Sequence, residues 1–367
     1  MRYKIEFTDL KKQYRNLEPE IVSALKEVME SARFINGPQV KELEQRMAQY
    51  CNTKYAVGVS SGTDALILSL MAIDIKPGDE VITTPFTFIA TAEVISLLKA
   101  VPVFVDIDEK TYNIDVSRIE EKISSKTKAI IPVHLYGQMA DMDEILKIAR
   151  KHNLFVIEDA AQAIGAEYKG KKSGSIGDFG AFSFFPAKNL GCYGDGGAIT
   201  TNNQESAEKL YMLRQHGSKA RYQHSLIGTN ARLDTMQAAV LLVKFKYLDK
   251  WLENRIKLAQ RYTEKLKHLV QTPYVKPERK HVFNQYTIRT EKRDELIKYL
   301  NENGIPTAVH YPKPLHLQEA FSYLGYKEGD LPVSEKISKE VLSLPMYPEM
   351  SEQEQDLVIE TIYKFFW

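Results

Sequence analysis

The stretch FSFFPAKNLGCYGDGG, residues 182–197, begins within a short apolar run, 181–185. It continues as a loop rich in glycine that leads to a second apolar run, 198–201. Further apolar, β-rich runs precede it, at 55–60, 80–84, 101–106, 129–135 and 155–158. Segments with helical patterning separate those earlier runs. Continuous apolar strands that alternate with helices indicate a largely parallel sheet covered on both faces. The sequence therefore predicts an α/β fold whose regular alternation breaks at residues 182–197.

The C-terminal third of the chain follows a different pattern. Residues 234–269 are expected to be helical, because their apolar side chains are spaced for one helix face. Two short strand candidates, 285–289 and 307–310, follow on either side of a helical segment. The pattern predicts a large domain over residues 1–250 and a smaller α+β C-terminal domain over residues 251–367.

Composition excludes several classes of protein. The chain has 367 residues with 49 Lys and Arg against 48 Asp and Glu, so it lacks the basic field of a nucleic-acid or membrane-surface binder. The lysines around Lys244–Lys250 are interpreted as the solvated face of a helix. Cys51 and Cys192 are too few for a disulfide scaffold or a four-cysteine zinc site, and no histidine spacing indicates a metal. With no secretory leader and no apolar stretch of membrane-spanning length, we expect a cytoplasmic protein.

Two motifs follow predicted strands at the edge of the sheet where ligands bind in open α/β folds. SSGTD, residues 60–64, opens a helix, where it either cradles a phosphate or caps the helix without a ligand. It is not the G-x-G-x-x-G pattern of a dinucleotide site. VIEDAAQ, residues 156–162, places Asp159 at a strand end, where an acid either holds a pyridinium nitrogen protonated or caps a helix.

Lys188 is the third chemical feature. Most lysines are solvated, but this one stands among aromatic residues in a restricted loop, where an amine more readily loses its proton and forms a Schiff base. Ser183 can add a hydroxyl to a phosphate site. A phosphate cradle, an acid for a ring nitrogen and a lysine for an aldehyde match the three handles of pyridoxal 5'-phosphate (PLP). The three motifs together predict a PLP enzyme.

Longer stretches resemble one family. SGTDA (61–65), TPFTFIATA (84–92), EDAAQ (158–162), FSFFPAK (182–188) and GDGGA (194–198) are similar to the DegT/DnrJ/StrS sugar-nucleotide aminotransferases. Shorter matches extend the resemblance across nearly the whole chain, at FTDL (7–10), NGP (36–38) and SLPM (343–346). The resemblance implies a fold-type I PLP enzyme whose large domain holds a seven-stranded sheet, in agreement with the seven apolar runs.

The resemblance also implies roles for particular residues. Lys188 would form the Schiff base with the cofactor and later move the proton between cofactor carbon and sugar carbon, while Asp159 would pair with the pyridine nitrogen. Phe88 would stack on the ring, and Gln162 would pack on its other side or against its 3-hydroxyl. The phosphate would be held by Gly62, Thr63 and Ser183, and by Asn230 of a partner subunit. A homodimer with shared active sites follows.

The lysine further separates two branches of this family. Related sugar 3-dehydrases carry histidine at the position of Lys188, so the lysine implies amino transfer from L-glutamate to a keto-sugar nucleotide. LYGQ (135–138), 188–197, ARLDT (231–235) and PTAVHYP (306–312) look closest to enzymes that aminate C3 of a UDP-linked 3-keto sugar. The expected substrate is UDP-2-acetamido-2-deoxy-3-oxo-glucuronate, in surface polysaccharide biosynthesis.

Candidate substrate-binding residues follow from the same resemblance. Arg232 suits a carboxylate, which belongs either to the glucuronate or to the glutamate donor. His310 and Tyr311 would contact substrate, or else be ordinary residues at a strand end. His134 is interpreted as a satisfied core histidine, with a place in the pocket wall as the alternative, and Cys192 as a packing residue.

Alternatives remain at this stage. The sugar can instead be neutral UDP-3-keto-GlcNAc or a dTDP-keto-6-deoxyhexose. A non-enzymatic regulatory paralogue that binds a sugar nucleotide is a different class, although it has no need of Lys188. A nicotinamide-dependent oxidoreductase shares the α/β class but would need a glycine-rich dinucleotide loop.

Overall fold

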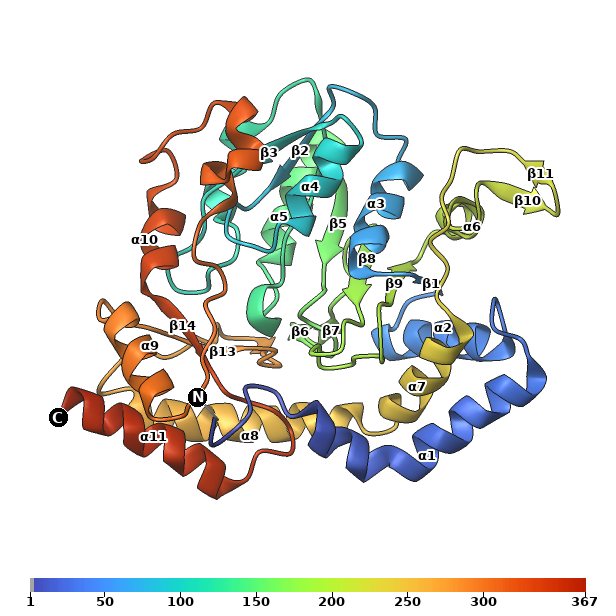
Figure 1. Ribbon diagram of the computed structural model, residues 1–367. Coiled ribbons are helices and arrows are strands. Elements are labelled where there is room, and N and C mark those ends of the chain that lie inside the picture. The colour runs from blue at the N-terminus through green and yellow to red at the C-terminus, as the bar shows by residue number, and fades with distance from the viewer. Residues whose placement is uncertain (1–2) are drawn as a thin grey trace.

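The computed structural model describes residues 3–367, and its centre is a seven-stranded sheet of order β1-β9-β8-β5-β4-β2-β3 (Figure 1). Strands β2, β3, β4, β5 and β8 run parallel, and β9 is antiparallel to both of its neighbours. Each of the apolar runs supplies one strand of this sheet, so the predicted α/β class is confirmed. The strands are β1 Tyr55–Val59, β2 Glu80–Thr83, β3 Val101–Phe104, β4 Thr127–Ile130, β5 Phe155–Asp159, β8 Phe179–Ser183 and β9 Gly197–Thr201.

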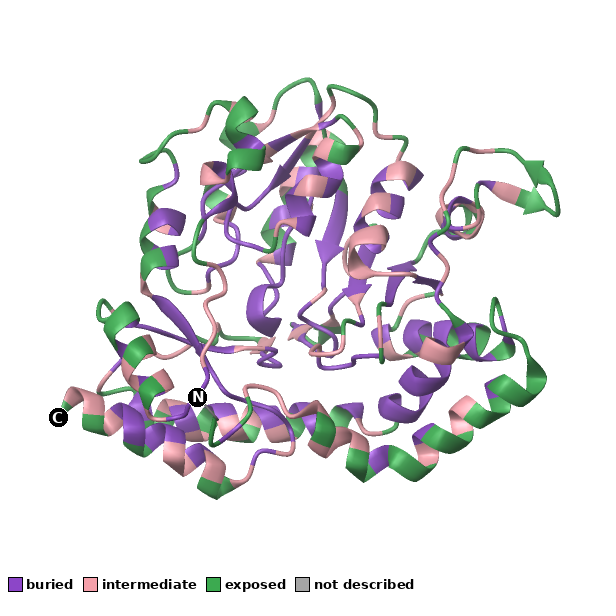
Figure 2. Ribbon diagram, viewed as in Figure 1, coloured by how far each residue is buried: buried purple, intermediate pink, exposed green. Residues whose placement is uncertain are grey.

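Helices cover both faces of the sheet, because successive strand residues point to opposite sides. In β5, Val156 packs into one apolar cluster with α2, α5 and α7, whereas Ile157 packs into another with α3, α4 and α6. Figure 2 shows these strands as buried. The helices are α1 Leu10–Ser31, α2 Pro38–Cys51, α3 Gly62–Ala72, α4 Ala90–Leu97, α5 Met142–His152, α6 Gln204–Leu213, α7 Thr235–Phe245, α8 Leu248–Leu266, α9 Arg293–Glu302, α10 Pro332–Glu340 and α11 Glu352–Phe366.

The C-terminal part has its own apolar cluster, in which α8, α9 and α11 pack against the antiparallel pair β13 (Tyr286–Arg289) and β14 (Val341–Leu344). Ile5, near the start of the chain, is buried in this cluster too. The division of the chain after residue 250 stays a prediction. No helix among residues 3–367 is long and apolar enough to cross a membrane.

Short elements complete the chain. β6, β7 and β12 form a small sheet, and β10 with β11 forms a hairpin that projects from the body at the right of Figure 1. Their bounds are β6 Glu167–Tyr168, β7 Lys171–Lys172, β10 Ser218–Ala220, β11 Gln223–His224 and β12 Arg279–Lys280. The 3-10 helices are η1 Val116–Arg118, η2 Glu120–Lys122, η3 Leu135–Gly137, η4 Leu315–Leu317 and η5 Glu319–Leu324.

Two expected elements differ from the structure. The strand candidate at 307–310 is wrong: only Ala308 makes an isolated bridge, to Ser343, and β14 is the strand that pairs with β13. The helix expected over 234–269 is divided at Lys246 and Tyr247 into α7 and α8. α7 is buried along nearly its whole length, whereas α8 is buried on one face only. The two segments therefore do not share one apolar face, as a single continuous helix would.

The lysines of this region also differ from expectation. Lys246 and Lys250 are exposed, but Lys244 is fully buried, so the interpretation as a solvated face is wrong for Lys244. Its Nζ donates to the carbonyl oxygen of Gly191 at 2.7 Å and lies 4.3 Å from the ring centroid of Tyr193. Burial lowers the pKa of Lys244 to about 8. Lys244 therefore ties α7 to the loop that carries Lys188.

Candidate active site

A cavity of about 470 Å³ opens at the carboxyl ends of the parallel strands. Its wall includes most of the site residues predicted from the sequence: Gly62, Thr63, Phe88, Asp159, Gln162, Ser183, Lys188, His310 and Tyr311. They come from the start of α3, the loop after β2, the ends of β5 and β8, and a loop near β14. The parallel strands bring these residues together because their carboxyl ends meet at one edge of the sheet.

One end of the cavity is formed by the first turn of α3 and by Ser183. The Ser61 hydroxyl caps the helix by accepting a hydrogen bond from the Asp64 N–H at 3.0 Å. A Cβ on Gly62 would lie 2.7 Å from Cβ of Ser183, so only glycine permits this close approach. The unpaired N–H groups and positive dipole end of a helix favour a phosphate. Capping and a phosphate cradle are thus compatible here.

Asp159 lies on the floor of the cavity, 5% exposed, at the end of β5. Its Oδ2 accepts a hydrogen bond from Thr91 Oγ1 at 2.8 Å, and its Oδ1 accepts one from the Ala161 N–H at 3.2 Å. Burial raises the pKa of Asp159, and these hydrogen bonds and the Lys188 ammonium oppose that shift. The residues directly after Asp159 form turns that lead to β6, not a helix, so the helix-cap alternative is wrong. A protonated ring nitrogen would give this buried carboxylate a countercharge.

The neighbouring acid has a structural role. Glu158 and His134 are fully buried and paired, with Nε2 of His134 2.8 Å from Oε2 of Glu158. Glu158 also accepts from the N–H groups of Gly174, Ile176 and Gly177, and His134 Nδ1 accepts from the Ala140 N–H at 3.2 Å. Burial works to raise the pKa of Glu158, but its hydrogen bonds lower it overall. His134 is the satisfied core histidine that the sequence suggested.

Lys188 lies at the turn of a tightly folded loop between β8 and β9. Its N–H donates to the Phe185 carbonyl at 2.8 Å, and the Cys192 N–H donates to the Phe184 carbonyl at 2.8 Å. A Cβ on Gly191 would lie 2.3 Å from the carbonyl oxygen of Pro186, so the two arms of the loop touch. Burial lowers the pKa of Lys188 to about 8, against an opposing effect of Asp159. The loop presents an amine that loses its proton readily.

The Cys192 side chain is buried at the base of the same loop. Its Sγ contacts the carbonyl oxygen of Phe184 at 3.0 Å. Burial raises the pKa of the Cys192 thiol to about 11, which keeps it protonated. Its position agrees with the expected packing role.

The opposite wall is aromatic and polar. The ring centroids of Phe88 and Tyr311 are 6.2 Å apart, and Gln162 Nε2 donates to the Tyr311 hydroxyl at 3.1 Å. His310 Nδ1 is 2.9 Å from the Ser343 hydroxyl, and burial lowers the pKa of His310 to about 4. His310 is therefore a neutral imidazole at neutral pH, and the cavity gains no positive charge from it.

Two predicted site residues lie outside the cavity wall. Asn230 is exposed, and its backbone bridges to Gln215 near the base of the β10–β11 hairpin. Arg232 bridges to Val59, and its Nε is buried without a hydrogen-bond partner among residues 3–367. Within this chain neither side chain lines the space in front of Lys188.

The sequence reasoning missed several cavity residues. Thr91 lies within the TPFTFIATA stretch, but nothing marked it as the hydrogen-bond donor to Asp159. Asn284 and Gln285 line the cavity from a distant segment with no motif of its own. Among residues 3–367 there is no group of three or more His, Cys, Asp or Glu side chains placed to hold a metal ion.

The geometry fits PLP. The glycine at position 62 lets the first turn of α3 lie against Ser183, so that backbone N–H groups and a hydroxyl can face a phosphate together. Asp159 offers a carboxylate to a ring nitrogen, and Lys188 offers an amine to an aldehyde. All three groups line one cavity. When bound, the cofactor supplies an electron sink for charge that develops on the substrate carbon.

Comparisons with known proteins agree with this site. The chain is 56% identical over 366 residues to a pleiotropic regulatory protein of Geobacillus stearothermophilus, covering 99% of this chain and 98% of that protein. It is 46% identical over 345 residues to UDP-2-acetamido-2-deoxy-3-oxo-D-glucuronate aminotransferase of Pseudomonas aeruginosa, covering 94% and 95%. Other similar proteins are transaminases of dTDP-linked sugars.

Solved structures extend the agreement to the fold. The crystal structure of S. venezuelae DesV in complex with a ketimine intermediate matches with a TM-score of 0.97 at 43% identity, covering 100% of this chain and 99% of that one. More distant solved aminotransferases hold the cofactor as PLP or as its amine form, PMP. The DegT/DnrJ/EryC1/StrS aminotransferase family model matches residues 15–363. The chain therefore belongs to the DegT/DnrJ/EryC1/StrS aminotransferase family and is a PLP-dependent sugar aminotransferase.

Proposed function

We propose that this enzyme transfers the amino group of L-glutamate to C3 of UDP-2-acetamido-2-deoxy-3-oxo-glucuronate, in the cytoplasm, for surface polysaccharide biosynthesis. The observation that carries the proposal is the joint presence of Lys188, His310 and Tyr311 in one cavity wall. The stretch PTAVHYP (306–312), which contains His310 and Tyr311, resembles UDP-linked 3-keto sugar aminotransferases in sequence. The 46% identity to the Pseudomonas aeruginosa enzyme supports a keto-sugar nucleotide substrate, and a transaminase of a dTDP-linked sugar is equally identical to this chain.

The side chains divide the work as follows. Lys188, with its lowered pKa, supplies a neutral amine for attack on a carbonyl and then carries the proton between the two reacting carbons. Asp159, oriented by Thr91, keeps the ring nitrogen protonated. Gly62, Thr63 and Ser183 bind the phosphate. Phe88 and Gln162 bracket the ring, and His310 and Tyr311 contact the sugar.

The active site is proposed to be shared in a homodimer. Asn230 and Arg232 lie outside the cavity of their own chain, and Asn230 is exposed and bridges to Gln215, just before the β10–β11 hairpin. Figure 1 shows this hairpin projecting from the body. In this arrangement Asn230 of one subunit reaches the phosphate bound by the other. Arg232, whose buried Nε has no hydrogen-bond partner among residues 3–367, is proposed to bind a substrate carboxylate through its guanidinium.

Substrate choice gives the direct test of this proposal. We expect wild-type enzyme, with glutamate as donor, to aminate the 3-oxo-glucuronate with higher kcat/KM than neutral UDP-3-keto-GlcNAc or a dTDP-keto-6-deoxyhexose. Arg232→Ala should lower kcat/KM for the glucuronate about tenfold or more, because it removes a charge-assisted contact. Steady-state rates and product masses provide the measurement.

Arg150→Ala is a suitable control, since Arg150 is exposed on α5 and away from the cavity. It should leave the rates unchanged. A higher kcat/KM for a neutral or dTDP-linked sugar would overturn the proposed substrate. An Arg232→Ala defect confined to the glutamate half-reaction would assign this residue to the donor instead.

The pKa of Lys188 predicts how cofactor capture depends on pH. Only the neutral amine attacks the PLP aldehyde, and the pKa of Lys188 is about 8. We expect the rate of covalent PLP capture by apoenzyme to rise roughly tenfold for each pH unit below about 8, and then to level off. Stopped-flow absorbance of apoenzyme mixed with PLP measures it. A rate that keeps rising up to the ordinary pKa of lysine would contradict the prediction.

A regulatory role has one observation in its favour, because the Geobacillus stearothermophilus relative is a pleiotropic regulatory protein by name. The intact set of Lys188 and Asp159 in one cavity favours catalysis, because a binding protein has no need of a reactive amine. Turnover by wild-type enzyme that Lys188→Ala loses would separate the two roles.

A further inference from the structure

Two carboxamide side chains in the cavity wall have acceptor atoms without a partner. Asn284 and Gln285 line the same cavity as Lys188. Asn284 is 8% exposed, and neither its Oδ1 nor Oε1 of Gln285 has a hydrogen-bond partner among residues 3–367. Leaving a buried acceptor unpaired is destabilising, and native proteins rarely do so. Hydrogen-bond donors on a ligand in the cavity would satisfy both acceptors.

The backbone of this segment is held firmly against η3. The Asn284 N–H donates to the Tyr136 carbonyl at 2.8 Å, and the Val282 N–H donates to the Gly137 carbonyl at 3.0 Å. A Cβ on Gly137 would lie 2.8 Å from Cγ2 of Val282, and Gly137 has a φ of +101°. Only glycine permits both the contact and the backbone angle. The two amides are thus attached to a rigid backbone.

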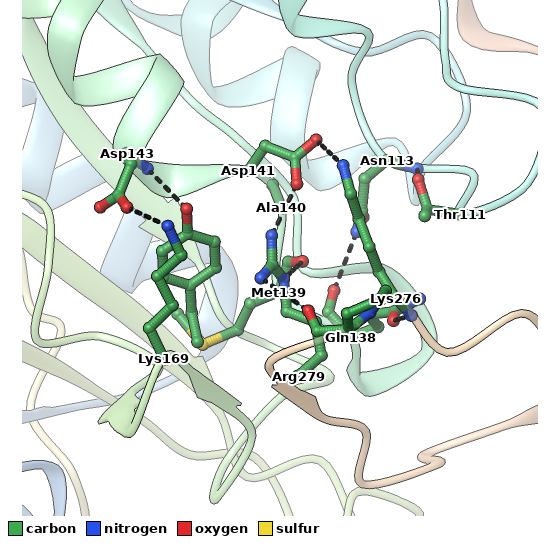
Figure 3. Close-up of polar contacts among 12 residues, drawn as sticks. Thr111, Asn113, Gln138, Met139, Ala140, Asp141, Asp143, Lys169, Lys276 and Arg279 are labelled. Atoms are coloured by element: carbon green, nitrogen blue, oxygen red, sulfur yellow. Dashed lines mark hydrogen bonds and ion pairs between the residues drawn. The ribbon is translucent and has the colours of Figure 1, made fainter.

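A polar network fixes the preceding residues of the same segment (Figure 3). Asp141 forms ion pairs with Lys276 at 2.7 Å and with Arg279 at 2.6 Å. Gln138 Oε1 accepts from the Lys276 N–H at 2.8 Å, and Asn113 Nδ2 donates to the Gln138 carbonyl at 3.0 Å. The close-up shows Asp141 facing both Lys276 and Arg279, with Asn113 and Gln138 beside them. A backbone that is already fixed before binding reduces the entropy lost when a ligand orders the two amide side chains.

The chemistry of the pair indicates what it binds. The cofactor's phosphate and ring nitrogen are assigned to other walls, at α3 and at Asp159. Asn284 and Gln285 come from the C-terminal part of the chain, as do His310 and Tyr311, the proposed sugar contacts. An amide oxygen accepts a hydrogen bond, which a hydroxyl or an amide N–H supplies and an ionised carboxylate does not.

We propose that Asn284 and Gln285 are specificity-determining residues that bind the sugar ring of the keto-sugar nucleotide. Their amide oxygens accept hydrogen bonds from its hydroxyl groups or from an acetamido N–H. The acetamido part of this assignment rests on the substrate named under Proposed function. The hydroxyl part applies to any nucleotide sugar that the enzyme aminates.

The test measures the two half-reactions separately in Asn284→Leu and Gln285→Leu. Each variant removes one acceptor and keeps a similar side-chain size. We expect kcat/KM of the sugar half-reaction to fall about tenfold in each variant, the effect of about one lost hydrogen bond. The rate of the glutamate half-reaction should stay unchanged. The Tm should stay level or rise, because the substitution removes an unpaired buried polar group.

Gln39→Leu is the matched control. Gln39 is 8% exposed on α2, its Oε1 is also unpaired among residues 3–367, and it does not line the cavity. It should leave both half-reactions unchanged. Asn284→Ala provides a second variant should the leucine fail to fold.

The outcomes separate this inference from the proposed substrate. The sugar used is whichever keto-sugar nucleotide wild-type enzyme aminates fastest, so a preference for another sugar would overturn only the substrate. An unchanged sugar half-reaction in both leucine variants would overturn the inference. So would equal losses in both half-reactions accompanied by a lower Tm, since these indicate a structural role.

Discussion

Lys188→Ala should lower kcat by about 10⁴-fold or more, because this one side chain is proposed to supply both the nucleophile and the acid–base group. Among residues 3–367, Lys188 is the one lysine in the cavity wall, and the imidazole of His310, with a pKa lowered to about 4, is a weak base that does not form a stable Schiff base. The absorbance of lysine-linked PLP should also disappear, leaving only non-covalently bound cofactor. Steady-state turnover and the absorbance spectrum of the purified variant measure the two effects.

Lys250→Ala is the control for this substitution, because Lys250 is exposed on α8 and far in sequence from the loop of Lys188. It should match wild type in rate and spectrum. Survival of the lysine-linked absorbance in Lys188→Ala would mean that another amine holds the cofactor. The assignment of Lys188 would then be wrong.

Asp159→Asn should produce the second largest effect, a fall in kcat of about 10²–10³-fold. A buried charge-assisted pair that loses one charge costs about 3–5 kcal/mol. The asparagine is nearly isosteric and can keep the hydrogen bond from Thr91, now 2.8 Å from the carboxylate, so the loss isolates the negative charge. The Kd of PLP should rise as well. Turnover and fluorescence titration of apoenzyme with PLP measure both.

Asp178→Asn tests the specificity of that effect. Asp178 also lies beside β5, where its Oδ2 accepts from the Val156 N–H at 2.8 Å, but it does not line the cavity. Burial raises the pKa of Asp178 as it does that of Asp159. The control should lower thermal stability and keep most of the activity. Comparable kcat losses in the two variants would show that the Asp159 effect comes from damage to the sheet.

Local patterns were enough to predict the sheet. The strands are recognisable because each is a short apolar run buried on both faces, as Val156 and Ile157 illustrate in β5. β14 was missed: in its place the sequence suggested 307–310, where only Ala308 bridges to Ser343. A short strand has too few residues to show a clear hydrophobic pattern, and its pairing depends on residues far away in the sequence.

For single residues of the cavity, too, the sequence predicts only those whose role depends on local motifs. Lys188, Asp159 and the first turn of α3 were predicted because each stands in a motif whose chemistry is local. Asn284 carries no such mark, since its significance comes from an unpaired oxygen in a cavity that other segments build. Lys244 was assigned to solvent because lysines are seldom buried, and only packing against Gly191 shows otherwise.

The sequence by itself determined the α/β class, the family and the cofactor, and it predicted Lys188 as the reactive lysine. Those depend on residue type and on spacing along the chain, which the sequence contains in full. Only the tertiary structure decided which polar groups are paired, which lysine is buried, and which residues share the cavity with Lys188. Burial and hydrogen-bond satisfaction depend on contacts between segments far apart in the chain, and no local pattern records them.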